Sequence, residues 1–217
     1  MASKHAWWKA GAWLGLFAWG ATASAAAPKQ PPKMSDAVLA TFSPEQATVE
    51  SRLEADFTGD GLRDLAVVVR NDDVRVLETF QGYVGDDASG YEPLGKMAMD
   101  PSPLGSAGLS VQKGVLLVED LTGGTSAVQS RYRFRYDPGE GAMRLIGDDV
   151  SYYSRTNQHD SLSISTNRLT GTQLVTRSVL GDDGTYADKP AQRKKVSSAP
   201  IYMDDAPTPE DTLGLDD

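Results

Sequence analysis

The chain of 217 residues contains no cysteine. Disulfide bonds, thiol nucleophiles and cysteine metal sites are therefore excluded, and no cysteine is available to carry a lipid. Histidine is almost as scarce, with two residues in the whole chain, so a histidine cluster for zinc is excluded as well. Something other than disulfides must stiffen the loops of this protein.

Groups suited to catalysis are also few. His159, in NQHDS, is the only histidine after the first 26 residues, and a serine hydrolase site would have to use it. Asp160 is too close in sequence to face its ring, so an exposed loop histidine is the favoured interpretation. Asp148 and Asp149 are neighbours, and neighbours in a strand point to opposite faces, so they do not form a catalytic pair. LTGGTS lacks the Gly-Lys-Ser/Thr of a phosphate-binding loop and indicates a turn.

Basic residues are in deficit. The formal net charge is −9, and it becomes −11 when Lys4 and Lys9 are left out. Nucleic acids and anionic membrane surfaces attract basic proteins, so we expect neither of them as a partner.

No apolar run is long enough for a membrane helix. Residues 10–20 are apolar and uncharged, which is about half of the roughly 20 residues that a span needs. Lys4 and Lys9 precede this run and the small residues of ATASAAA follow it, a pattern typical of a secretory signal peptide over residues 1–26. We therefore expect a periplasmic or secreted protein without a membrane span after cleavage.

Composition separates a central domain from its two flanks. Residues 27–36 are rich in proline and predict a flexible linker. Residues 201–217 combine proline with acidic residues and predict an acidic, disordered tail. One β-domain is expected between them, over residues 37–200.

Hydrophobic periodicity inside this domain is that of β-strands. TVESRLEAD alternates, LAVVVR is a continuous β-branched run, and VRVLETF follows the turn residues NDD. Further strands are expected in LSVQKGVLLVED around a Lys113–Gly114 turn, in AMRLIGDD, in SLSISTN and in TQLVTRSVL. A helical period is visible only in MSDAVLATF. We expect an all-β fold of mainly antiparallel strands.

The strand in SRYRFRYD shows the clearest alternation in the chain. Three aromatic residues point to one face and three arginines to the other, namely Tyr132, Phe134 and Tyr136 against Arg131, Arg133 and Arg135. This pattern predicts a half-buried antiparallel strand. The arginine row could hold an acidic partner, but a solvated face paired with neighbouring acids is the favoured interpretation.

The clearest chemistry lies in EADFTGDGLRDLAVVVR, where oxygen-bearing side chains run into an apolar strand. Counted from the first aspartate as position 1, the candidate ligands at positions 1, 3, 5, 7 and 9 are Asp56, Thr58, Asp60, the Leu62 carbonyl and Asp64. Gly61 at position 6 permits a sharp turn, and this spacing is that of a calcium loop. Carboxylates that converge without a cation repel one another, which favours Ca²⁺ over the alternative of a bare Asp-Gly turn. Val67 at position 12 excludes an EF-hand, which needs glutamate there.

This pattern, D-x-x-G-D-G-x-x-D-L followed by a β-run, resembles the FG-GAP and VCBS-type calcium loops of exported bacterial proteins. The resemblance covers about ten residues, and Thr58 stands where those families usually carry Asp or Asn. A propeller would repeat the loop in every blade, whereas VGDDASG and LGDDGTYAD have the acids without the spacing. We therefore expect a compact sandwich or a degenerate propeller-like domain with one calcium loop.

Three functions are compatible with these features. The favoured one is an exported calcium-binding β-protein of structural or binding type, without enzymatic activity, whose partner is an exported protein or a cell-wall component. The second is a periplasmic inhibitor or immunity protein against a cell-wall lytic enzyme, by analogy with small calcium-loop β-proteins. The third is a hydrolase whose site the sequence does not reveal.

Overall fold

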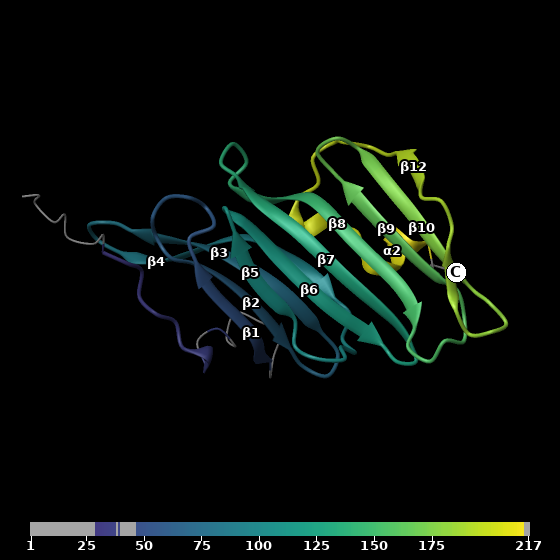
Figure 1. The fold of residues 1–217 in the computed structure, drawn as a ribbon. Coiled ribbons are helices and arrows are strands. Elements are labelled where there is room, and N and C mark those ends of the chain that lie inside the picture. The colour runs from purple at the N-terminus through teal and green to yellow at the C-terminus, as the bar shows by residue number, and fades with distance from the viewer. Residues whose placement is uncertain (1–28, 38, 40–46, 215–217) are drawn as a thin grey trace, which may run out of the picture.

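The computed structural model describes residues 29–37, 39 and 47–214, so the predicted signal peptide lies outside the described residues. Within these residues twelve strands form two sheets, and every strand pair is antiparallel (Figure 1). This confirms the predicted all-β, mainly antiparallel fold. None of the helices within the described ranges is long and apolar enough to cross a membrane.

The smaller sheet has four strands in chain order. They are β1 (Thr48–Ala55), β2 (Asp64–Arg70), β3 (Arg75–Val84) and β4 (Ser89–Met99). The larger sheet has eight strands in the order β11-β10-β9-β8-β7-β6-β5, and β12 pairs with β10. Its strands are β5 (Gly108–Gln112), β6 (Val115–Gly123), β7 (Ser126–Asp137), β8 (Ala142–Ser154), β9 (Ser161–Asn167), β10 (Thr172–Leu180), β11 (Tyr186–Asp188) and β12 (Gln192–Lys195).

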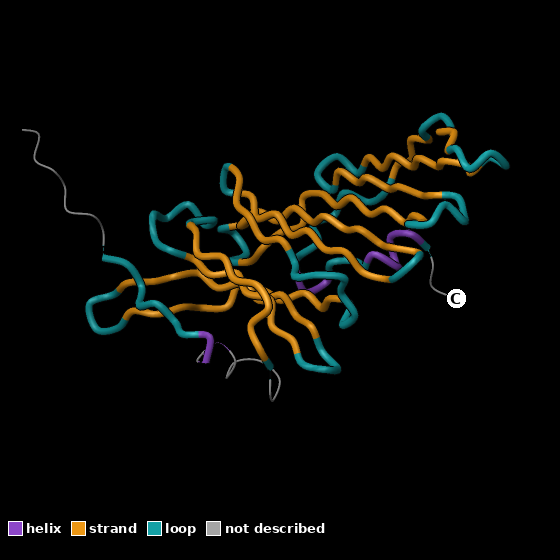
Figure 2. The backbone as a smooth tube through the Cα atoms, turned by 60° about the horizontal axis from the view of Figure 1, so that its bottom comes forward, coloured by secondary structure: helices purple, strands orange, loops and turns teal. Residues whose placement is uncertain are grey.

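The two sheets pack into a sandwich over part of the larger sheet. Their shared core contains Ala66, Val68 and Leu77 from one side and Phe134 and Leu145 from the other. The strands β9, β10 and β12, labelled in Figure 1, extend beyond this overlap, as the turned view of Figure 2 also shows. The larger sheet is thus only partly a sandwich layer.

Strand β2 is buried on both faces. Val68 faces the shared core, while Leu65, Val67 and Val69 belong to a second core on the outer face with Leu39. This double burial explains why LAVVV is a continuous apolar run, because each pleat position has an apolar environment.

The aromatic face of SRYRFRYD is buried, as its alternation predicts. Tyr132 and Phe134 are 3% and 0% exposed, with ring centroids 6.1 Å apart. On the opposite face Arg131 pairs with Glu119 and Arg133 with Asp149, which confirms the interpretation of a solvated face paired with neighbouring acids.

The C-terminal residues differ from the prediction of a disordered tail over 201–217. The described part, to residue 214, is ordered: η1 (Met203–Asp205) lies against β4 and β8, and α2 (Pro209–Leu213) lies against β7, β8 and β9. Met203 is 1% exposed in the shared core, and Leu213 is 7% exposed in a third core beneath β8, β9 and β10. The average composition did not predict the order of this segment, because two buried apolar side chains are enough to fix it on the domain.

The proline-rich residues 29–37, which we call the N-terminal strap, also differ from the flexible linker predicted over residues 27–36. Pro31 is buried, and a methyl group at Gly82 would meet its Cγ at 2.6 Å and the Arg63 carbonyl oxygen at 2.1 Å. Gly82 is therefore required for close packing at this point. The strap lies against the loop that precedes β2 and covers the adjacent face of the smaller sheet.

Candidate metal loop and adjoining pockets

Residues 56–64, which we call the aspartate loop, join β1 to β2 and are shaped by side-chain bonds to backbone amides. Asp56 accepts hydrogen bonds from the amides of Gly59 at 2.6 Å and Gly61 at 2.9 Å. Both glycines have positive φ, 85° and 82°, a conformation that favours glycine. The turn predicted at position 6 is thus present.

Asp64, at the start of β2, is fully buried. One carboxylate oxygen accepts hydrogen bonds from the amides of Phe57 at 2.8 Å and Thr58 at 2.9 Å, and the other accepts one from Gly82 of β3 at 3.1 Å. Burial raises the pKa of Asp64, and these hydrogen bonds offset only part of that effect. Asp64 therefore ties both the loop and the neighbouring strand to β2.

The loop is bonded to two other segments of the chain. Asp60 accepts hydrogen bonds from the Leu62 amide at 2.8 Å and from the Gln81 side chain of β3 at 2.9 Å. In the N-terminal strap, Gln30 accepts a hydrogen bond from the Arg63 amide at 2.8 Å and donates one to the Gly61 carbonyl at 3.1 Å. The loop thus connects the strap with β2 and β3.

The donor set fits a hard cation in part. Asp56 and Asp60 are exposed. The hydroxyl oxygen of Thr58 is buried and has no hydrogen-bond partner among the described residues, although it lies close enough to Asp64 to lower that residue's pKa. Within the described ranges, no three Asp, Glu or His side chains are gathered into a group that could hold a metal ion. The structure therefore does not place the carboxylate of Asp64 together with those of Asp56 and Asp60. A cation here would be held by Asp56, Thr58, Asp60 and the Leu62 carbonyl, with water completing its shell.

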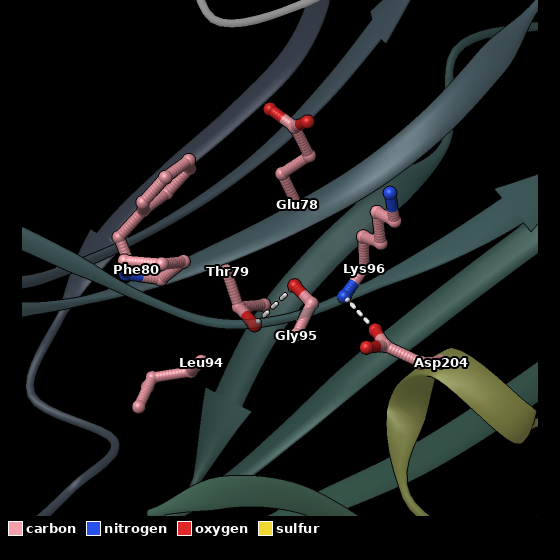
Figure 3. A pocket seen from close by; sticks show the side chains of 8 residues that line it. Glu78, Thr79, Phe80, Leu94, Gly95, Lys96 and Asp204 are labelled. Atoms are coloured by element: carbon pink, nitrogen blue, oxygen red, sulfur yellow. Dashed lines mark hydrogen bonds between the residues drawn. The ribbon is translucent and has the colours of Figure 1, made fainter.

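A pocket of about 440 Å³ lies where η1 meets the bulged strand β4 (Figure 3). Asp204 accepts a hydrogen bond from the Lys96 amide at 2.5 Å, and Thr79 donates one to the Gly95 carbonyl at 3.0 Å. On β3, Glu78 and Phe80 project to the side opposite Thr79 (Figure 3). The edge of β4 is thus covered in part by a carboxylate, which hinders pairing with another strand.

A second pocket, of about 650 Å³, adjoins the first and shares three of its residues. It lies between the N-terminal strap and the β3–β4 hairpin and is lined by Pro32, Met34, Glu78, Phe80, Tyr83, Gly90, Tyr91 and Pro93. The sequence reasoning missed this pocket because its walls are some fifty positions apart in the chain. The aromatic residues of VRVLETFQGYV were the available signal.

His159 has a more defined environment than an exposed loop histidine. The residue is half-buried, and its ring stacks on Tyr152 with a centroid distance of 4.8 Å. Its Nε2 lies 2.9 Å from the Ser126 hydroxyl, and its Nδ1 lies 2.6 Å from the Asp160 carbonyl oxygen. Sequence reasoning did not anticipate Ser126, which is 33 positions from the histidine.

Asp148 and Asp149 have separate partners, as their adjacency predicts. Asp148 is fully buried and accepts two hydrogen bonds from Arg168, at 2.5 and 3.0 Å. Asp149 accepts hydrogen bonds from Arg133 and Ser165, both at 2.6 Å. Burial would raise the pKa of Asp149, but these bonds outweigh it and the pKa is lowered. Neither carboxylate is placed as an acid or base beside the other.

No family model, no curated protein and no solved structure matches this chain. The site must be interpreted from its own geometry.

Proposed function

We propose that this chain is an exported, non-enzymatic binding protein whose β-domain is stabilised by Ca²⁺ in the aspartate loop. The observation that carries the proposal is the position of the loop, because Gln30, Gln81 and Gly82 all bond to it. A cation bound there strengthens the junction of three chain segments. Without cysteine, the chain has no disulfide to do this.

The stabilisation by calcium is small. Extracellular calcium modules bind with a Kd of about 10⁻⁴ to 10⁻³ M, so about 1 mM Ca²⁺ contributes about 0.4 to 1.4 kcal/mol. For a domain of this size that corresponds to a rise in Tm of about 1 to 5 °C. The proposed role of the ion is to stabilise the fold and not to take part in catalysis.

The proposal is tested by melting the protein in Ca²⁺ and in a chelator. Asp60→Asn is the informative variant, because the amide keeps the bond from Leu62 and loses the charge. We expect Ca²⁺ to raise the Tm of the wild type and to leave that of Asp60→Asn unchanged. Asp86→Asn, in the exposed β3–β4 turn, is the control and keeps the calcium shift. Equal Tm values for the wild type with and without Ca²⁺ contradict the proposal.

An exported protein or a cell-wall component is the partner class that fits this compartment. If the partner is a cell-wall lytic enzyme, the protein would act as its inhibitor. This alternative predicts that the protein blocks the lysis of cells by a muramidase in a turbidity assay. Full lysis in the presence of excess protein rejects the inhibitor without affecting the calcium proposal.

A second candidate function is a hydrolase, favoured by the contact between Ser126 and His159. With Nδ1–H donating to the Asp160 carbonyl, Nε2 is free to accept the Ser126 proton, as in a nucleophilic serine site. In a serine hydrolase triad a carboxylate orients the histidine, whereas here the Asp160 backbone carbonyl has that position. A fluorophosphonate tests this directly: labelling of the wild type that is lost in Ser126→Ala and His159→Gln supports an enzyme, and an unlabelled wild type rejects it. Ser151→Ala, on the outer face of β8, is the matched control.

A further inference from the structure

The pocket of about 650 Å³ between the N-terminal strap and the β3–β4 hairpin has the size of a small-molecule site. Three of its lining residues are aromatic and three more are Pro32, Met34 and Pro93, while Glu78 supplies the carboxylate. Such a lining is mostly apolar with one charged group, which is the usual composition of a site that selects its ligand.

The walls of this pocket are held in place from behind. Phe80 and Tyr91 pack on the outer core that contains Leu65 and Val67. Pro32 follows the buried Pro31, which lies against Gly82 of β3. A site whose rings are already packed loses little side-chain entropy when a ligand binds.

The charges around the pocket favour a cation. Glu78 lies on the same side of β3 as Phe80 (Figure 3), so its carboxylate and the ring border one space. Lys96 is opposite Glu78 in the β3–β4 register and lines the adjoining pocket together with Asp204. The two pockets together therefore carry two acids and one base, in a chain of net charge −9.

We propose that this pocket binds a small organic cation of the trialkylammonium class. The faces of aromatic rings attract a cation, and sites built from several rings are used to recognise quaternary ammonium groups. Methyl groups on the nitrogen bury against Phe80, Tyr83, Tyr91 and the prolines, while Glu78 complements the charge. The inference rests on the proposed function as a binding protein and names the class of its ligand.

The test compares choline with its neutral isostere 3,3-dimethylbutan-1-ol by isothermal titration calorimetry. The two molecules have nearly the same shape, so a difference in affinity reports the charge. We expect a Kd of about 1 mM for choline and binding at least about tenfold weaker for the alcohol. Tyrosine fluorescence is an independent readout, because all four tryptophans lie in the first 19 residues and a chain starting at residue 27 contains none.

Three variants test the site, two of which should weaken choline binding and one of which should strengthen it. Glu78→Gln weakens choline binding and leaves the alcohol unaffected, whereas Lys96→Met strengthens choline binding because it removes a competing positive charge. Tyr83→Leu weakens choline binding by removing a ring that belongs to none of the three cores. Tyr186→Leu, on β11 and 36% exposed, is the control and binds like the wild type. Melting curves confirm that each variant is folded.

The proposal is overturned if choline does not bind the folded wild type, or if choline and the alcohol bind equally. It is also overturned if Glu78→Gln and Lys96→Met both leave the affinity for choline unchanged. These outcomes do not involve the aspartate loop, so the calcium shift in Tm is judged separately.

Discussion

Arg75 of β3 and Asp120 of β6 join the two sheets through a paired contact inside the sandwich. The guanidinium group donates to both carboxylate oxygens, at 2.6 and 2.9 Å, and its side chain is 0% exposed. It also donates two hydrogen bonds to Glu50 of β1, at 2.7 and 2.8 Å. One buried arginine thus connects two strands of the smaller sheet with one of the larger.

Removal of this arginine should be costly. Arg75→Met removes the ion pair of the buried Asp120 and leaves Glu50 only the longer one with Arg70, at 3.9 Å, so we expect a loss of about 3 to 5 kcal/mol in the free energy of unfolding. Urea unfolding measures the loss. Arg133→Met is the control, because Arg133 and Asp149 are 33% and 35% exposed and their pair contributes less than about 1 kcal/mol. Similar losses in the two variants would mean that Arg75 has no special role.

Acid should reduce the effect of that substitution. Burial would raise the pKa of Glu50, but the hydrogen bonds from Arg75 and from the Ala107 amide outweigh it and lower the pKa below 4.5. Glu50 therefore stabilises the wild type above pH 4.5, and this contribution is lost as the pH falls through the lowered pKa. We expect the difference between the wild type and Arg75→Met to shrink below pH 4.5, and a constant difference would contradict this explanation.

Asp64 should be sensitive to an isosteric change. Asp64→Asn presents an amide group to one of the three backbone N–H donors, so we expect a loss of about 1 to 3 kcal/mol. Asp183→Asn is a matched control, because Asp183 also accepts a backbone amide, that of Thr185, but is exposed. Chemical denaturation of both variants measures the difference, and equal stability of Asp64→Asn and the wild type would show that the bonds are dispensable.

The pH dependence of Asp64 has the opposite sign to that of Glu50. Its pKa is raised above 3.8 in the folded state, so its ionisation costs stability as the pH rises through the window above 3.8. This cost is absent from Asp64→Asn. The difference in free energy of unfolding between the wild type and the variant should therefore be larger below pH 3.8 than at neutral pH. A difference that is larger at neutral pH would contradict a raised pKa of Asp64.

Gly82 should not tolerate a side chain. Gly82→Ala places a methyl group 2.1 Å from the Arg63 carbonyl oxygen and 2.6 Å from Pro31, so strap and loop must move, at about 1 to 3 kcal/mol. Gly105→Ala is the control, because nothing lies within 4 Å of its added carbon. Thermal melting distinguishes them, and a Gly82→Ala protein as stable as Gly105→Ala would show that the strap is not packed there.

Met203 should behave as a core residue. Met203→Ala removes a side chain that is 1% exposed, and we expect a loss of about 2 to 5 kcal/mol. Leu104→Ala, at a position 41% exposed, should change stability by less than about 0.5 kcal/mol. If Met203→Ala unfolds at the denaturant concentration of the wild type, the C-terminal segment does not contribute to the core.

Strands were predictable because their signal is local. The alternation in SRYRFRYD and the continuous run LAVVV each report the burial of the pleat positions within a few residues, and the structure has the corresponding faces buried in β7 and β2. The roles of the flanks were not predictable in this way. Met203 and Pro31 are single buried residues within polar or proline-rich segments. The average composition of a segment does not reveal such residues.

The aspartate loop shows a second limit of sequence reasoning. Spacing identified the aspartates that shape the loop, and Asp56 and Asp60 do bond to its amides. Aspartates that accept hydrogen bonds from backbone amides and aspartates that bind a cation can have the same spacing in the sequence, so spacing does not distinguish the two roles. Spacing alone could not show that Asp64 is enclosed by three amides, since one of them belongs to β3.

The contact of Thr79 with Met203 bears on how the protein reaches its fold. The Thr79 hydroxyl lies 3.6 Å from the Met203 sulfur, across 124 positions of the chain. A chain under synthesis therefore lacks part of its core until Met203 has emerged, and contacts of such long sequence separation form slowly. The shared core is therefore completed only after the strands of both sheets have been synthesised.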